Sequence, residues 1–224
     1  GNAISSTNNN VTLNVNDIYL DGMVSVSAGD TLSIFTKDPT TTIGLGGGIG
    51  VLNLNTVELS KLSAGNKVVI GESGVQTGDM DVDAWDLSDT NFDVEFYAND
   101  IFMGGIDMGT GDILAHAQDS GVDEGRLTVD GNIDRDEAGN STLDLRADHL
   151  VYITSANITS TTGAIDIILN ADRDADEDGR VVLITSDIAT NGGYFIAGGG
   201  SGDVGGVDGI LGNGDGTGAD DIAT

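Results

Sequence analysis

The chain has 224 residues, of which 37 are acidic and 8 basic, so its formal net charge at pH 7 is −29. A field of this sign repels nucleic acid and anionic lipid, and we expect neither as a partner. The lack of cysteine excludes disulfides and thiolate metal sites. No run of 18 apolar residues exists in the sequence, so we expect no insertion into a membrane.

A half-buried strand pattern recurs from residue 11 onward. It reads apolar, any, apolar, any, small, two variable residues, apolar, and this alternation is typical of a strand with one buried face. The copies begin 39, 42, 49 and 38 residues apart, which favours stacked units that cannot each bury a core alone. Their first residues are Leu13, Leu52, Val94, Leu143 and Val181.

A small residue followed by glycine stands between each copy and the next strand, as in Thr110-Gly111 and Thr162-Gly163. We expect such glycines to supply turns that need a positive φ. Short strands with small corner residues predict an all-β fold, a parallel β-helix or solenoid. The alternative is a series of antiparallel β-sandwich repeats, but tight hairpin signals are few and the strand spacing is irregular.

Composition divides the chain into three parts. Residues 1–10 form a polar arm, residues 11–197 carry the β-helix repeats, and residues 198–224 are a Gly/Asp-rich tail or an incomplete rung. Two Asp-rich stretches, roughly residues 119–140 and 172–179, lie between strands of the repeats. We predict that both are loop insertions that protrude from the β-helix.

Two stretches of the chain carry a resemblance. They are LNADRDADEDGRVVLITSDIATNGGYFIAGGG (Leu169–Gly200), with Ile165–Leu169 before it, and TTIGLGGGIGVLNLNTVELSKLSAGNKVVIG (Thr41–Gly71). Both resemble repeats of filamentous-haemagglutinin-like, large repetitive bacterial surface proteins. The resemblance implies a secreted, right-handed parallel β-helix that serves adhesion, biofilm or filament formation.

Alternating aspartates before a glycine form the sharpest candidate site. Alternate residues can turn their carboxylates to one side, and a glycine permits the bend, as at the opening of a calcium loop. The distal glutamate of an EF-hand is missing, because the chain continues directly into a strand. We predict calcium as the candidate cofactor, and the alternative is a solvated acidic loop. The candidate ligands are Asp172, Asp174, Asp176 and Asp178.

A second acidic stretch is a weaker candidate for the same ion. It also places oxygen-bearing side chains at alternate positions, here after a glycine-containing turn. The candidate ligands are Asp130, Asn132, Asp134 and Asp136.

Catalytic motifs are missing from the sequence. It contains no nucleophile elbow, no zinc motif and no glycine-rich phosphate loop followed by lysine, so we do not expect an enzyme. We interpret His116 and His149 as ordinary strand residues. Trp85, Tyr97 and Tyr152 are interpreted as packing residues rather than as a platform for sugar rings.

These patterns together predict a structural or adhesive segment of an extracellular, cell-surface protein of bacterial type. Its main partner is a copy of itself, in head-to-tail contact that builds a rod or filament, and host or matrix carbohydrate or protein is a further partner. The alternative function is a carbohydrate-binding or carbohydrate-active β-helix. Carboxylates that converge on a groove favour the alternative, and scattered aspartates favour the structural role.

Overall fold

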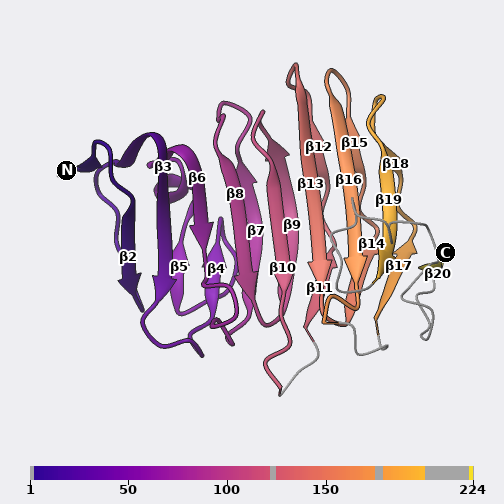
Figure 1. Cartoon of the computed structure of the whole chain (residues 1–224), viewed down its shortest axis with the longest axis horizontal. Helices are drawn as coiled ribbons and strands as arrows, with labels where there is room; N and C mark the ends of the chain where they lie inside the picture. The colour runs from indigo at the N-terminus through magenta and orange to yellow at the C-terminus, as the bar shows by residue number, and fades with distance from the viewer. Residues whose placement is uncertain (1–2, 122–124, 175–178, 200–221, 224) are drawn as a thin grey trace.

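The computed structural model describes residues 3–121, 125–174, 179–199 and 222–223. Within them the chain forms 20 β-strands and one short helix, α1 (Thr56–Leu59). The strands lie side by side along the longest axis of the molecule, and the colour follows the chain from one end to the other (Figure 1). The prediction of an all-β fold is confirmed.

Nine strands form one sheet, sheet A, in the order β1, β3, β6, β8, β10, β13, β16, β19, with β2 paired to the second half of β3. Their bounds are β1 (Ile4–Ser6), β2 (Val11–Val15), β3 (Val24–Thr36), β6 (Leu62–Ile70), β8 (Asp93–Ala98), β10 (Ile113–Ala117), β13 (Asn140–Ala147), β16 (Ala164–Ala171) and β19 (Phe195–Gly199).

Eleven strands form the second sheet, sheet B, around the long strand β9. The first half of β9 pairs with β11 and its second half with β12, while β7 pairs along both halves on the other side. The bounds are β4 (Ile43–Leu45), β5 (Leu52–Leu54), β7 (Met80–Asp86), β9 (Ile101–Met108), β11 (Arg126–Val129), β12 (Ile133–Arg135), β14 (Leu150–Thr154), β15 (Ile158–Ser160), β17 (Arg180–Ile184), β18 (Ile188–Ala189) and β20 (Ile222–Ala223).

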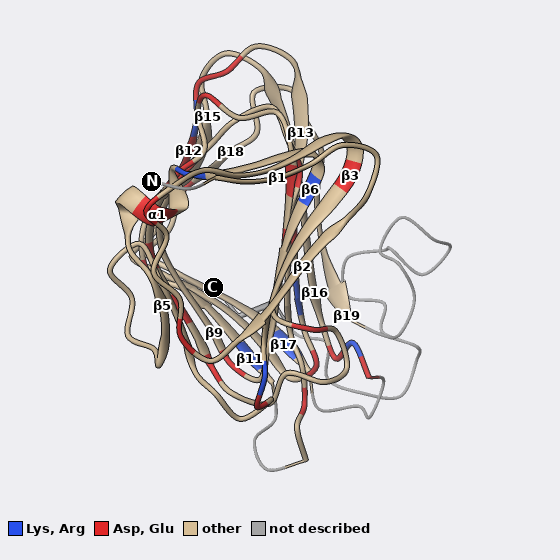
Figure 2. Ribbon diagram, turned by 90° about the vertical axis from the view of Figure 1, so that its left-hand side faces the viewer, with Lys and Arg blue, Asp and Glu red and all other residues tan. Residues whose placement is uncertain are grey.

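Every strand pair between described residues is parallel, which does not fit the alternative of antiparallel sandwich repeats. From β6 onward the chain alternates between sheet A and sheet B. Figure 2 looks at the molecule from its N-terminal end, and both sheets surround a common interior. One continuous apolar cluster fills that interior.

Period-2 alternation explains which residues build the core. In β13 the side chains of Leu143, Leu145 and Ala147 are fully buried, whereas Asp144 and Arg146 between them face outward and form an ion pair at 2.6 Å. Val94, Phe96 and Val181 are buried as well, and Leu183 packs against the core while staying partly exposed. The inward positions of the strand pattern are therefore confirmed.

The stacking period predicted from the repeat spacing is wrong. Leu143 lies in register between Ile113 and Ile167, and Ile113 lies in register with Val94, so successive strands of sheet A follow one another more closely along the chain than predicted. Val181 belongs to sheet B, so the predicted copies do not all stack on one another. The pattern missed β10 because its inward positions after Ile113 are alanines, which read as weakly apolar.

The loop insertion predicted for residues 119–140 is also wrong. This stretch contains β11 and β12, which pair on both sides with neighbouring strands of sheet B. Leu127, Val129 and Ile133 are fully buried, so alternating apolar residues decide the structure despite the many aspartates between them. In the second predicted loop, residues 175–178 lie outside the described residues.

The structure describes some of the residues in the predicted polar arm (residues 1–10) and in the predicted tail (residues 198–224). Ile4–Ser6, within the predicted polar arm, is strand β1 and pairs with Val24–Val26 of β3. At the other end, β19 reaches Gly199, and β20 pairs with β17. Most of the predicted tail, residues 200–221 and Thr224, lies outside the described residues.

Short polar side chains extend the hydrogen-bonded ladder between successive strands. In each case an Asp or Asn oxygen accepts the backbone N–H of a residue on the next strand, where the backbone ladder begins or bends. The accepting residue and the donating N–H are Asn10 and Thr31 (2.8 Å), Asn16 and Asp38 (3.0 Å), Asp79 and Asp100 (3.2 Å), Asp100 and Arg126 (2.8 Å), Asp93 and Asp112 (2.9 Å), Asp112 and Thr142 (2.7 Å), Asn132 and Asn157 (3.0 Å), Asn157 and Asp187 (3.2 Å), and Asp166 and Tyr194 (3.0 Å).

We expect Leu145→Asp to destabilise the fold by at least about 4 kcal/mol, because it places an unpaired charge among fully buried side chains. Chemical denaturation measures the free energy of unfolding. Leu114→Asp is the matched control, since Leu114 of β10 is half-buried on the outward face, and we expect it to cost about 1 kcal/mol. Equal costs for the two variants would contradict the inward register of β13.

Asn157→Ala tests the side-chain ladder. It removes the acceptor of the solvent-exposed N–H of Asp187, and we expect a loss of about 0.5–1 kcal/mol in the free energy of unfolding. Asn157→Asp keeps an accepting oxygen and should restore most of that stability. If both variants lose the same amount, the hydrogen bond is not what Asn157 contributes.

Candidate functional site

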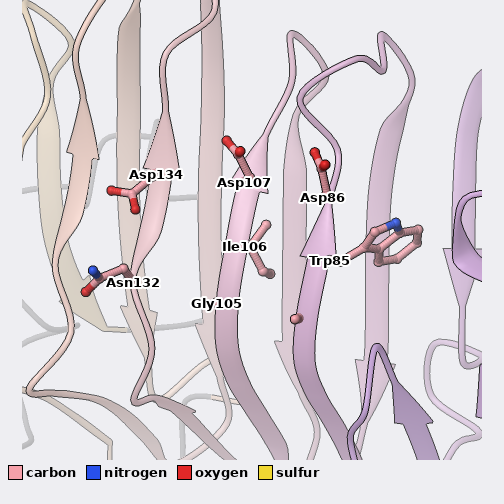
Figure 3. Close-up of a pocket in the computed structure, with 8 residues that line it drawn as sticks. Trp85, Asp86, Gly105, Ile106, Asp107, Asn132 and Asp134 are labelled. Atoms are coloured by element: carbon pink, nitrogen blue, oxygen red, sulfur yellow. The ribbon is translucent and has the colours of Figure 1, made fainter. Parts of the chain in front are cut away.

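A row of three aspartates crosses the outer face of sheet B. Asp86 of β7, Asp107 of β9 and Asp134 of β12 lie in register on neighbouring strands, whose spacing is about 4.8 Å. The residues just before them, Trp85, Ile106 and Ile133, are buried, and alternation therefore turns all three aspartates to the solvent side. Figure 3 shows the three aspartates on successive strands.

A shallow hollow of about 310 Å³ lies beside this row. Two residues before Asp86 and Asp107 on the same outward face stand Ala84 and Gly105, which lie in register and have little or no side chain, so the surface is low there. Asn132 lines the hollow on the β12 side. A second hollow of about 290 Å³ shares Ala84, Trp85 and Asp86 and is closed by Thr56 and Ser60 beside α1. The face is therefore concave and presents carboxylates.

The carboxyl groups of Asp107 and Asp86 have pKa values shifted in opposite directions. Partial burial raises the pKa of Asp107, and the negative charges of Asp86, Asp136, Asp134 and Glu137 raise it further. For Asp86 the hydroxyl and then the backbone N–H of Ser88 lower the pKa by donating to the carboxylate.

Hydrogen bonding distinguishes the third aspartate of the row. The carboxylate of Asp134 accepts the hydroxyl of Thr159, its register neighbour on β15, at 2.6 Å. A row that joins a carboxyl group of raised pKa, Asp107, to a carboxylate that already accepts a hydroxyl, Asp134, can hydrogen-bond further hydroxyl groups.

The outer face of sheet A carries a second acidic row. Asp93, Asp112, Thr142 and Asp166 stand in register on β8, β10, β13 and β16. Burial raises the pKa of Asp112, the backbone N–H and hydroxyl of Thr142 oppose this, and the charge of Asp93 adds to the rise. A hollow of about 230 Å³ lies beside Asp93 and Asp112. Both aspartates already accept backbone N–H groups of the next strand, so we interpret this row as part of the hydrogen bonding that holds the strands together.

The structure places the first predicted calcium group only in part. Asp172 is fully buried with a positive φ of 59°, and its backbone packs so closely on Gly179 that an added Cβ there would lie 2.1 Å from the Asp172 nitrogen. Asp174 is exposed, and Asp176 and Asp178 lie outside the described residues. Calcium binding at this group stays a prediction.

The second predicted calcium group follows one extended line rather than a closed loop. Asp130, Asn132, Asp134 and Asp136 are all exposed at alternate positions through β12. Side chains two residues apart on a strand are separated by about 6.6 Å, which spreads them along the sheet. In the part of the chain that the structure describes, no three or more His, Asp or Glu side chains are grouped so as to hold a metal ion.

The histidines and aromatic residues occupy structural positions. Trp85 borders the hollow beside Asp107, but its side chain is buried, with its ring centroid 5.9 Å from that of Phe96, so the packing interpretation is confirmed for this residue. His116 Nε2 lies 2.9 Å from Asp148 Oδ1 on the outer face of sheet A. Tyr152 lies under the guanidinium of Arg126, 5.0 Å from it.

Sequence reasoning missed the row of Asp86, Asp107 and Asp134. The signal was an apolar residue followed by aspartate near the end of three sheet B strands, namely Trp85-Asp86, Ile106-Asp107 and Ile133-Asp134. It becomes visible only when strands of the same sheet are aligned, and the predicted stacking period did not align them.

No family model, no curated protein and no solved structure matches this chain significantly. Among the described residues, no helix has the length and apolar character needed to cross a membrane.

The raised pKa values predict that stability rises in mild acid. A carboxyl group whose pKa is raised by folding binds its proton more tightly in the folded state. Such a group therefore lowers the free energy of unfolding at pH values above its pKa in the folded state. This destabilisation is lost as the pH falls toward 3.8, the ordinary pKa of an aspartate. We expect Asp107→Asn to raise the Tm at pH 7 by about 1–2 °C, a small effect because Asp107 is exposed, and to flatten the rise in mild acid.

Asp86→Asn is the matched control for this measurement by calorimetry from pH 7 to pH 4. Its pKa is lowered in the folded state, so its contribution has the opposite sign and the variant should not gain stability at pH 7. A lower Tm for Asp107→Asn at pH 7 would contradict the assignment.

Proposed function

We propose that the chain is a structural or adhesive segment of an extracellular, cell-surface protein, folded as a right-handed parallel β-helix that extends by head-to-tail contact with further copies. The observation that carries the proposal is the strand order. From β6 onward both sheets follow the chain order along one axis with parallel pairing throughout, and each pass adds one step to both sheets. Right-handed crossovers are the rule for parallel strands, which supports the handedness.

The two ends of the described fold support association. Val11, Leu13 and Val15 on β2 at one end, and Leu183 and Phe195 at the other, face the core but stay partly exposed. The outer edge of β2 is unpaired among the described residues, as is that of β19. A second copy that adds a strand there would continue the parallel ladder and cover these side chains.

The distribution of charge supports contact between unlike ends. Residues 1–70 carry five acidic residues and three lysines, whereas the remaining residues carry 32 acidic residues and five arginines. Contact between two acidic ends would bring most of the negative charge together, and head-to-tail contact avoids this. Since both partners are still acidic overall, screening by salt should promote the contact.

A second candidate function is a carbohydrate-binding or carbohydrate-active β-helix. The hollow beside Asp86, Asp107 and Asp134 favours it, because carboxyl groups on a concave face can hydrogen-bond the hydroxyl groups of a sugar. The burial of Trp85, the aromatic residue that borders this hollow, weighs against strong stacking on sugar rings.

Light scattering and electron microscopy over a series of NaCl concentrations test the proposal, with calcium as a separate arm. We expect particles of the unmodified chain to lengthen as salt rises. Leu13→Asp introduces a charge at the β2 end and should keep the protein monomeric, while Thr12→Asp puts the same charge on the exposed face of that strand and should not. A strict monomer at every ionic strength would contradict the filament and leave the carbohydrate alternative.

A further inference from the structure

Arg135 carries a positive charge into the interior of the molecule. It is the last residue of β12, where alternation turns Ile133 and Arg135 inward and leaves Asp134 in solvent. Only 1% of Arg135 is exposed, and its register neighbours on the inner face are Met108 and Ser160. A guanidinium keeps its charge at any physiological pH, so this position holds a buried cation.

The guanidinium has few partners among the described residues. Its Nη2 donates to the carbonyl oxygen of Gly139 at 3.0 Å. Its Nε and Nη1 have no hydrogen-bond partner there, and no carboxylate of the described residues forms an ion pair with it. Three N–H groups, one on Nε and two on Nη1, therefore remain as donors.

The neighbouring residues make room for the group and add a hydroxyl. An added Cβ at Gly163 would lie 2.3 Å from Nη1, and Gly139 has a φ of 104°, so glycine is needed at both turns. Ser160 donates its hydroxyl to the carbonyl of Gly163. Ser141, at the start of β13 just after Gly139, is 3% exposed, and its Oγ has no partner among the described residues.

A buried charge without a counter-charge is strongly unfavourable, more so than a methionine at the same place. The many carboxylates of the chain do not relieve it, because the nearest along the strand, Asp134 and Asp136, face solvent. The missing partner must be small, since Arg135 is only 1% exposed and Gly163 already packs against one side of its Nη1. We propose that the interior binds a monovalent inorganic anion of the chloride class at Arg135.

This inference does not depend on the proposed function, and thermal unfolding tests it separately. The unmodified chain is compared in sodium chloride and in sodium gluconate at equal ionic strength, because gluconate is too large for the site. At a tenfold excess of chloride over its Kd, we expect the Tm to be roughly 3–6 °C higher than in gluconate. The Arg135→Met variant should show no difference between the two salts.

Arg126→Met is the matched control, because it removes the same charge from a side chain that already contacts the hydroxyl of Thr128 and the ring of Tyr152. It should keep the chloride effect. Crystals soaked in bromide should show an anomalous peak beside the Arg135 guanidinium, and this readout stands even if Arg135→Met does not fold. Equal Tm values of the unmodified chain in both salts, an Arg135→Met variant that is more stable in both, or no bromide peak would each overturn the proposal.

Discussion

The rest of the structure depends on one interaction, the hydrogen bond from a backbone N–H to an Asp or Asn side chain on the preceding strand. A parallel ladder leaves N–H groups without backbone acceptors where strands begin and bend, and these side-chain oxygens pair them. Neighbouring strands are about 4.8 Å apart, a distance that a one-methylene side chain bridges at 2.7 to 3.2 Å, as at Asp112 and Asn157. At these positions the short reach of aspartate and asparagine suits the distance, which favours them over glutamate.

The same arrangement sets the electrostatics. Where register places two aspartates side by side, one charge acts on the other: burial raises the pKa of Asp112, and the neighbouring charge of Asp93 raises it further. Hydrogen bonds to the charged form oppose this, and the balance differs from site to site. Part of the negative charge therefore stands in two rows that cross the sheets.

The sequence predicted what local alternation controls. Inward positions such as Val94 and Leu143 follow from period-2 patterns of apolar residues, and parallel pairing follows from short strands with small corner residues and few hairpin signals. The stacking period did not follow, because β10 carries alanines at two inward positions and so escapes an apolar pattern. Arg135 and the row through Asp107 were missed for a related reason, since their meaning lies in the neighbours that register supplies across strands.

The aspartates of the two sheets fall into two groups, those that accept a backbone N–H from the next strand and those that do not. Asp93, Asp100 and Asp112 accept backbone N–H groups and so serve the ladder. Asp107 accepts no backbone N–H among the described residues, and its carboxyl group is destabilised by its neighbours. A residue that lowers stability and serves no ladder position is not explained by folding, and it lies beside a concave floor of Ala84 and Gly105. Substitution of Asp107 leaves the backbone hydrogen bonds intact. If this face binds a ligand, Asp107 is therefore a residue at which selection for binding acts without cost to the strand pairing.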